Sequence, residues 1–205
     1  MKYICYLLVT VLLTGNNLSA QIYTAIKAGG GFATLKPKYE NNFPGRVVWY
    51  GGLLVHIETQ SQFFFQPELL YSLRGYRLNA GAFGNTYSTN ISYGYLSMPL
   101  LAGYKPAKNV SILVGPEPGY LLSAKSHPDN NTSVYARNVN NRFSVDATAG
   151  AALSITPELA IEARVVIGMT GLYRVTYVDN NGSQIETTNT GRNRVLQVGI
   201  TYRVN

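Results

Sequence analysis

Charged side chains that could carry chemistry lie deep within apolar stretches of this sequence. The carboxylates are Glu68, Glu117, Asp146 and Glu162, and the cations are Lys27, Arg74, Arg164 and Arg203. Carboxylates that are brought close together could act as a general acid and base. The same groups could instead neutralise one another as a buried structural network. The elements that position them decide between these two interpretations.

The two histidines give no support to other catalytic or metal chemistry. His56 lies on an expected strand near a turn and His127 in an expected loop, and neither has metal-ligand spacing to another histidine or to a cysteine. Two such histidines provide no Ser/His/Asp arrangement. The run "GGGF", Gly29 to Phe32, precedes no lysine–serine pair and no expected helix, so it is not a phosphate-binding loop. We therefore expect no enzyme, no cofactor and no metal site.

Apolar and polar residues alternate along eight segments, which is the pattern of half-buried β-strands. The expected strands are Ile22–Leu35, Val47–Glu58, Phe63–Arg77, Tyr93–Lys105, Val110–Ala124, Arg142–Ile155, Leu159–Arg174 and Arg194–Asn205. Short connectors follow the second, fourth and sixth strands. Long connectors follow the others, at residues 36–46, 78–92, 125–141 and 175–191. Long loops at one end and tight turns at the other are typical of an outer-membrane β-barrel.

The charges within these strands fall on the less apolar face. In the seventh strand, for example, Glu162 and Arg164 alternate with Ile161 and Val165. The apolar face could point inward in a soluble barrel, or outward to lipid in a membrane barrel. The polar faces are rich in Gly, Ala, Ser and Thr, and charged residues make up only 13% of the chain, against about 25% in typical soluble domains. Both observations favour the membrane barrel.

Aromatic residues gather near the ends of the expected strands, where amphipathic rings suit a membrane interface. They include Tyr23, Trp49, Phe63, Phe64, Tyr76, Tyr93, Tyr104, Tyr120, Phe143, Tyr173 and Tyr202. We therefore predict an all-β fold: an eight-stranded antiparallel up-and-down transmembrane β-barrel in the lipid of the outer membrane. Because the interior of such a barrel is only wide enough for side chains, we interpret the eight charged residues as a structural lumen network.

The first residues predict export. A lysine precedes an apolar stretch of about ten residues, which is too short to span a bilayer, and a polar run ends at Ala20. This is the layout of a secretory signal peptide, so we expect residues 1–20 to be removed and residues 21–205 to form the barrel domain. Cys5 would be lost, which leaves no disulfide. The net charge of +7 comes from scattered basic residues, which does not favour nucleic-acid binding.

Four stretches resemble the PorT-like outer-membrane β-barrel domain that is widespread in Bacteroidota: "FFFQPELLYSLRGYRL", "YGYLSMPLLAGYKP", "VGPEPGYLLSAK" and "LQVGITYRV". Members commonly show Q-P-E-L-L-Y-S in the third strand, Y-L-x-x-P-L-L in the fourth and G-P-x-x-G-Y-L-L in the fifth. These motifs read Gln66–Ser72, Tyr95–Leu101 and Gly115–Leu122 here. The resemblance covers essentially the whole mature chain. It implies the barrel fold and brings no catalytic residues.

The resemblance also implies assembly by the barrel-assembly machinery, which reads a terminal aromatic residue in most such barrels. Here Val204 and Asn205 follow Tyr202-Arg203, so this sequence departs from that pattern.

The expected function is a structural or interaction role in the outer membrane. The long extracellular loops, rich in asparagine and tyrosine, offer adaptable surface to a protein or surface ligand. One alternative is a small-solute porin, although aqueous channels have sixteen or so strands. A second is a component of a secretion apparatus, which one branch of the PorT-like family resembles. A third is a soluble secreted β-barrel that binds a small ligand.

Overall fold

The computed structural model describes residues 21–36, 44–59, 61–82, 85–128, 134–135, 141–171, 173–178 and 184–204. The predicted signal peptide, residues 1–20, lies outside these residues. The strands are β1 (Ile22–Lys36), β2 (Arg46–Glu58), β3 (Phe63–Ala82), β4 (Asn85–Ser97), β5 (Leu100–Ala107), β6 (Val110–Pro128), β7 (Val134–Tyr135), β8 (Phe143–Ser154), β9 (Leu159–Gly168), β10 (Tyr173–Val178), β11 (Gln184–Thr190) and β12 (Arg192–Arg203). Among the described residues, no helix is long and apolar enough to cross a membrane.

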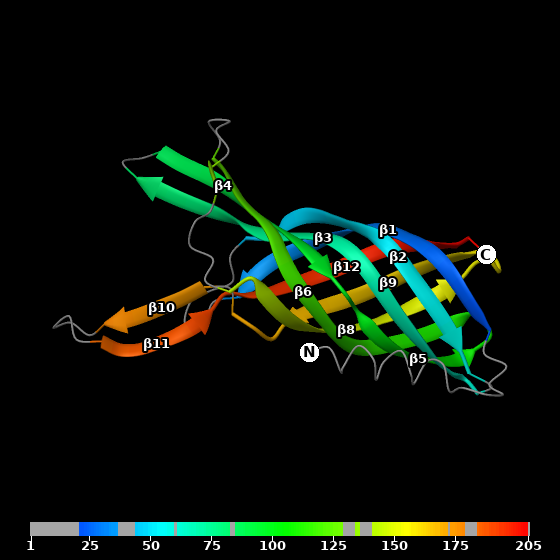
Figure 1. Cartoon of the computed structure of the whole chain (residues 1–205). Coiled ribbons are helices and arrows are strands. Elements are labelled where there is room, and N and C mark those ends of the chain that lie inside the picture. Colours follow the sequence, from blue (N-terminus) through cyan, green and yellow to red (C-terminus); the bar gives the residue numbers. More distant parts are fainter. Residues whose placement is uncertain are drawn as a thin grey trace.

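The strands close into an antiparallel barrel (Figure 1). Hydrogen-bonded neighbours follow the order β2-β1-β12-β9-β8-β6-β4-β3-β5, and further pairings join β2 to β3 and β6 to β5. β4 and β5 follow one another along the same position of the wall, between β3 and β6. The wall therefore has eight strand positions, and the last strand pairs with the first. The predicted eight-stranded antiparallel barrel is confirmed.

The predicted fourth strand, Tyr93–Lys105, is two strands, β4 and β5, that flank Met98 and Pro99. Pro99 interrupts the ladder because a proline has no backbone N–H to donate. Backbone hydrogen bonds still join this point of the wall to the neighbouring strands β6 and β3. Met98 N donates to Pro118 O at 2.8 Å, and Glu68 N donates to Pro99 O at 2.9 Å. The break therefore divides the strand without opening the wall.

At the end of the barrel that carries the long connectors, several strands run further than the sequence predicted. β3 extends to Ala82 and β4 begins at Asn85, so most of connector 78–92 is a paired extension of the wall. β6 extends to Pro128, which places His127 in a strand and not in a loop. These extensions of β3, β4 and β6 project together beyond the barrel (Figure 1).

The predicted seventh strand, Leu159–Arg174, is also too long. β9 ends at Gly168, and β10 pairs with β11 in a separate two-stranded sheet. The hairpin register runs from Tyr173 opposite Thr190 to Val178 opposite Gln184. Most of connector 175–191 is therefore a hairpin, drawn in orange to one side of the barrel (Figure 1).

Side chains alternate between two environments along each barrel strand. In β12, Leu196, Val198 and Ile200 are exposed on the outer surface, whereas Asn193 and Gln197 are buried. Large apolar side chains elsewhere in the wall also point outward. This distribution is the reverse of a soluble barrel, whose apolar side chains fill the interior, and is typical of a wall that faces lipid.

Outward-facing aromatic rings meet in pairs across neighbouring strands of the wall. The rings of Trp49 on β2 and Tyr71 on β3 have centroids 5.4 Å apart. The rings of Phe63 on β3 and Tyr104 on β5 have centroids 5.2 Å apart, next to the short connectors. Aromatic pairs on the outer wall of a membrane barrel form the girdles at its two interfaces.

A single glycine on β3 is required by the backbone itself. Gly75 has φ of 141°, and a Cβ there would overlap the carbonyl oxygen of Ile91 on β4. We expect Gly75→Ala to lower the free energy of unfolding by about 1–3 kcal/mol, because the alanine would combine a strained backbone with a steric clash. Urea unfolding of the barrel in detergent micelles measures the change.

The matched control for this prediction is Gly30→Ala on β1. A Cβ at Gly30 would have Val48 O at 3.7 Å as its nearest neighbour, which is ordinary contact. We expect a change of less than about 1 kcal/mol there, in the stabilising direction if the unfolded chain dominates. Equal losses at both glycines would show that the backbone conformation at Gly75 carries no special strain.

Candidate functional site

Four of the predicted charged residues meet in the lumen, and we call them the central cluster: Lys27, Glu68, Glu162 and Arg164. The Lys27 ammonium donates to Glu68 Oε1 at 2.5 Å and to Glu162 Oε2 at 2.8 Å. Arg164 donates from Nη1 to Glu68 Oε2 at 2.8 Å and from Nε to Gln197 Oε1 at 2.6 Å. All four charged side chains are buried. Two cations thus balance two carboxylates.

Three further charged residues form what we call the outer cluster: Arg74, Glu117 and Asp146. Arg74 Nη2 donates to Glu117 Oε1 at 2.7 Å, while Arg74 Nη1 pairs with Asp146 Oδ2. Thr148 Oγ1 donates to the second oxygen of Glu117, Oε2, at 2.6 Å. Ser97 Oγ accepts from Arg74 Nη2 at 3.2 Å. One buried guanidinium therefore serves two buried carboxylates.

Each cluster is covered by the ring of a buried tyrosine. The guanidinium carbon of Arg164 lies 4.8 Å from the ring centroid of Tyr50, and that of Arg74 lies 4.7 Å from the ring centroid of Tyr95. Tyr50 and Tyr95 are 2% and 0% exposed. Cation–π contacts of this kind are stronger when they are desolvated. The rings fill lumen space that water would otherwise occupy.

The inward-facing side chains of β3 show how the lumen is layered along its axis. From the short-connector end outward, those that are buried are Phe64, Gln66, Glu68, Leu70, Ser72, Arg74 and Tyr76. Apolar side chains therefore lie at the two ends of this series, and the charged clusters lie between them. Phe64 packs with Leu101 and Leu113 at the short-connector end.

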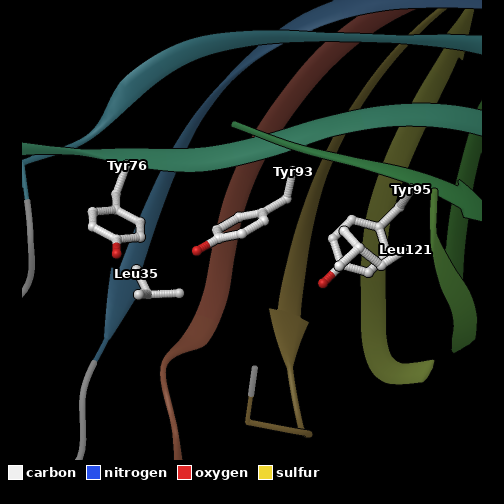
Figure 2. Close-up of a cluster of buried hydrophobic side chains, with 5 residues drawn as sticks. All are labelled: Leu35, Tyr76, Tyr93, Tyr95 and Leu121. Carbon is white, nitrogen blue, oxygen red and sulfur yellow. The ribbon is translucent and has the colours of Figure 1, made fainter. Parts of the chain in front are cut away.

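A cluster of tyrosines and leucines fills the lumen on the other side of the outer cluster. It consists of Leu35, Tyr76, Tyr93, Tyr95 and Leu121. Figure 2 shows the three tyrosine rings reaching from β3 and β4 toward the two leucines. The rings of Tyr76 and Tyr93 have centroids 6.4 Å apart. The charged interior is thereby covered on its long-connector side.

His56 links the short-connector end to the central cluster. Its ring is stacked between those of Tyr23 and Phe64, with centroids at 4.6 and 4.3 Å. His56 Nδ1 lies 3.0 Å from Gln66 Oε1, and Gln66 Nε2 donates to Glu68 Oε1 at 2.7 Å. His56 is therefore a packed residue of the lumen wall. Among the described residues, no group of three or more His, Cys, Asp or Glu side chains is arranged to hold a metal ion.

Arg203 was predicted to belong to the charge network, and the structure places its guanidinium over the ring of Tyr23. It is half-buried, and its guanidinium carbon lies 4.5 Å from the ring centroid of Tyr23, near the short-connector end of the lumen. The strand alternation put Arg203 on the correct face. Alternation gives no information about the depth of a side chain along the barrel axis. Arg203 is the last residue of β12 and therefore lies at the end of the lumen.

The sequence prediction missed the uncharged members of the clusters: Gln66, Ser97, Thr148 and Gln197. Gln66, Thr148 and Gln197 each share a strand face with a charged residue, for example Gln66 with Glu68, so alternation alone could have suggested them. Ser97 lies on β4, which carries no charged residue. Their partners could not be predicted, because Gln197 meets Arg164 only through the pairing of β12 with β9. The arrangement neutralises the buried charges. The carboxylates of both clusters are buried and paired, so none is accessible for acid–base chemistry.

A family model of the outer membrane protein beta-barrel domain matches residues 17–174. The chain belongs to this family. The outer membrane protein beta-barrel assignment fixes the location of the chain, since members are integral proteins of the outer membrane. In such barrels the long connectors are extracellular and the short turns periplasmic. The extensions of β3, β4 and β6 and the β10–β11 hairpin therefore lie on the extracellular side.

Solved structures of small outer-membrane proteins share the fold of this barrel. Neisserial surface protein A is 9% identical, with a TM-score of 0.56, over 91% of this chain and 99% of that chain. Ail, the attachment invasion locus protein of Yersinia pestis, is 14% identical, with a TM-score of 0.51, over 90% of this chain and 99% of that chain. A comparison with curated proteins finds no match to the sequence.

Proposed function

We propose that this protein is a sealed, non-enzymatic outer-membrane barrel that binds a partner through its extracellular extensions. The observation that carries the proposal is the ion pair between Glu68 and Arg164. These residues project from β3 and β9, which occupy opposite positions of the eight-position wall. A buried ion pair across the full width of the lumen leaves side chains, and not water, in the pore. The proposal therefore assigns function to the outer surface of the extracellular end.

The extracellular structure offers two kinds of binding surface. The extensions of β3, β4 and β6 continue the wall as a paired sheet, and the β10–β11 hairpin stands apart in a separate sheet. Sites that are built on paired strands hold their side chains more rigidly than sites on irregular loops. The Ail structure contains a heparin analogue. A sulfated glycan is therefore a reasonable first probe for this chain.

Within the family we further propose a PorT-like subgroup and assembly by the barrel-assembly machinery. The support is structural, because the motif residues have clear roles in the wall. Glu68 of the third-strand motif anchors the central cluster, and Pro99 of the fourth-strand motif divides β4 from β5. At Gly115 of the fifth-strand motif, a Cβ would overlap the carbonyl oxygen of Leu100. These roles explain the motifs as features of barrel construction.

Removal of the hairpin tests the interaction role. We expect replacement of residues 173–190 by a short Gly-Ser linker to leave the barrel folded, because the hairpin forms its own sheet. Folding is checked by the shift in gel mobility on heating. Bacteria that display the intact chain should adhere to immobilised heparin, collagen or mucin, and adhesion should fall at least about tenfold without the hairpin. Lys108→Ser in a periplasmic turn is the matched control.

Two results would contradict the proposal. In the first, bacteria that display the chain adhere no better than bacteria without it, or the hairpin deletion leaves adhesion unchanged. In the second, the purified barrel passes a steady ionic current across a planar bilayer, which would favour the small-solute porin over the sealed barrel.

A further inference from the structure

The outer surface of the barrel wall carries its charge at one end only. Among the described side chains of the strands, the charged ones with outward orientation are Lys36, Arg77, Lys125, Arg192 and Arg194. All five are cations, all are exposed, and all lie at the extracellular end of their strands or on the adjoining extensions of β3 and β6. The other charges of the described wall point inward or lie in periplasmic turns.

Three of these cations form one patch on the pair β1–β12, and we call it the basic rim: Lys36, Arg192 and Arg194. Lys36 is directly opposite Arg192 in the register of the two strands. Opposed side chains in an antiparallel pair have Cβ atoms about 5 Å apart. Arg194 lies two residues further along the same face of β12, about 7 Å from Arg192. Three positive side chains thus share a small area.

The register places the basic rim at the border of the lipid-facing surface. Four cross-strand pairs follow one another along this face toward the extracellular end. They are Val198 opposite Gly30, Leu196 opposite Phe32, Arg194 opposite Thr34, and Arg192 opposite Lys36. Phe32, Leu196 and Val198 are each more than half exposed. The apolar face therefore changes to a cationic face within two residues along β12 and within four along β1, at the level where acyl chains give way to head groups.

The basic rim lacks compensation from the described part of the chain. Like charges directly opposite each other on a strand pair are destabilising. Among the described side chains, none of the three basic-rim residues forms an ion pair with a carboxylate. The clusters of the lumen, by contrast, pair their cations with carboxylates. An external anion would relieve the repulsion among these three cations.

We propose that the basic rim binds the phosphate groups of a phosphorylated glycolipid in the outer leaflet. The depth of the rim selects this ligand, because its anion must lie immediately above the acyl chains that cover Phe32 and Leu196. Arginine pairs of this spacing suit phosphate oxygens, which accept several hydrogen bonds at once. A soluble polyanion has no acyl chains to cover the apolar part of the same face. The inference goes beyond the interaction role proposed above and does not depend on it.

The single tryptophan provides a direct test. Trp49 on β2 is opposite Gly30 and is exposed on the same wall. Lipid A with brominated acyl chains, mixed into phosphatidylcholine vesicles, should quench Trp49 fluorescence at a low mole fraction. In the triple variant K36Q/R192Q/R194Q, we expect the half-quenching mole fraction to rise about 100-fold, from the contribution of three cations at a charged membrane surface. The gel-mobility shift on heating confirms that each variant is folded.

The matched control is the triple variant K108Q/K125Q/R142Q, which removes three exposed cations outside the basic rim: Lys108 in a turn, Lys125 on the extension of β6 and Arg142 just before β8. It should retain the half-quenching mole fraction within about threefold. Brominated lipid A without phosphates should quench no better than brominated phosphatidylcholine. The proposal would be overturned if dephosphorylated lipid A quenched Trp49 as well as phosphorylated lipid A. It would also be overturned if the half-quenching mole fraction rose equally in the two triple variants. Removal of the quenching by excess soluble heparin would assign the rim to a mobile polyanion instead.

Discussion

Removal of the Arg74 guanidinium is expected to lower the free energy of unfolding by about 3–5 kcal/mol. Arg74→Ala leaves Glu117 and Asp146 buried without the cation that pairs with both of them. An uncompensated buried carboxylate is more costly than the absence of the whole ion pair, and here two carboxylates lose one partner. Urea unfolding of the barrel reconstituted in vesicles measures the loss.

Two further variants separate the charge effect from the loss of side-chain volume. Arg77→Ala removes an exposed arginine three residues further along β3, and we expect a change within about 0.5 kcal/mol. Adding Glu117→Gln and Asp146→Asn to Arg74→Ala should recover part of the loss, because the amides need no counter-charge. If this combined variant is less stable than Arg74→Ala alone, the outer cluster does not act through charge.

A charge placed on the lipid-facing wall is expected to be nearly as damaging. Val198→Arg introduces a guanidinium at a position that is 54% exposed, on the outer face of β12 between Leu196 and Ile200. If it lies near the bilayer midplane, we expect a loss of about 2–4 kcal/mol, because the charge must leave water for hydrocarbon. Ile112→Arg on β6 should behave in the same way.

The control for this prediction uses the depth dependence of the effect. Val47→Arg introduces the same side chain on the outer face of β2 at its extracellular end, where Val47 is 77% exposed. The loss should be about 0–1 kcal/mol there, since the guanidinium reaches the interface. Equal stability of the Val47 and Val198 variants would mean that the apolar wall does not face lipid.

Strand alternation was sufficient to predict the class of fold and the face on which each charge lies. A period of two residues is a local property of one strand, so it can be recognised without knowledge of the neighbouring strand. For this reason alternation places Lys27, Arg74 and Arg164 on the lumen face without information on strand pairing. Local alternation could not predict which cation meets which carboxylate. Lys27 and Glu162, for example, are separated by 135 residues in the sequence.

The differences between prediction and structure have identifiable causes. Residues 78–92 are rich in Asn, Ser, Thr and Gly, which are turn formers, and they lack an apolar face because the extension of β3 and β4 rises beyond the membrane. Alternation does not predict the interruption at Pro99, because apolar residues alternate on both sides of it. Periodicity also gives no depth, so it could not predict that Arg203 lies over the ring of Tyr23 near the short-connector end.

The central cluster has a consequence for how the barrel closes during assembly. Lys27 and its partners Glu68 and Glu162 come from three different strands, so the cluster is complete only after β1 and β12 have paired. A slip of one residue in a strand would turn its side chains to the opposite face. For β1, this would direct Lys27 into the acyl chains and leave two carboxylates without their ammonium partner. We therefore expect the buried ion pairs to favour the correct register when β1 and β12 pair at the closure of the barrel.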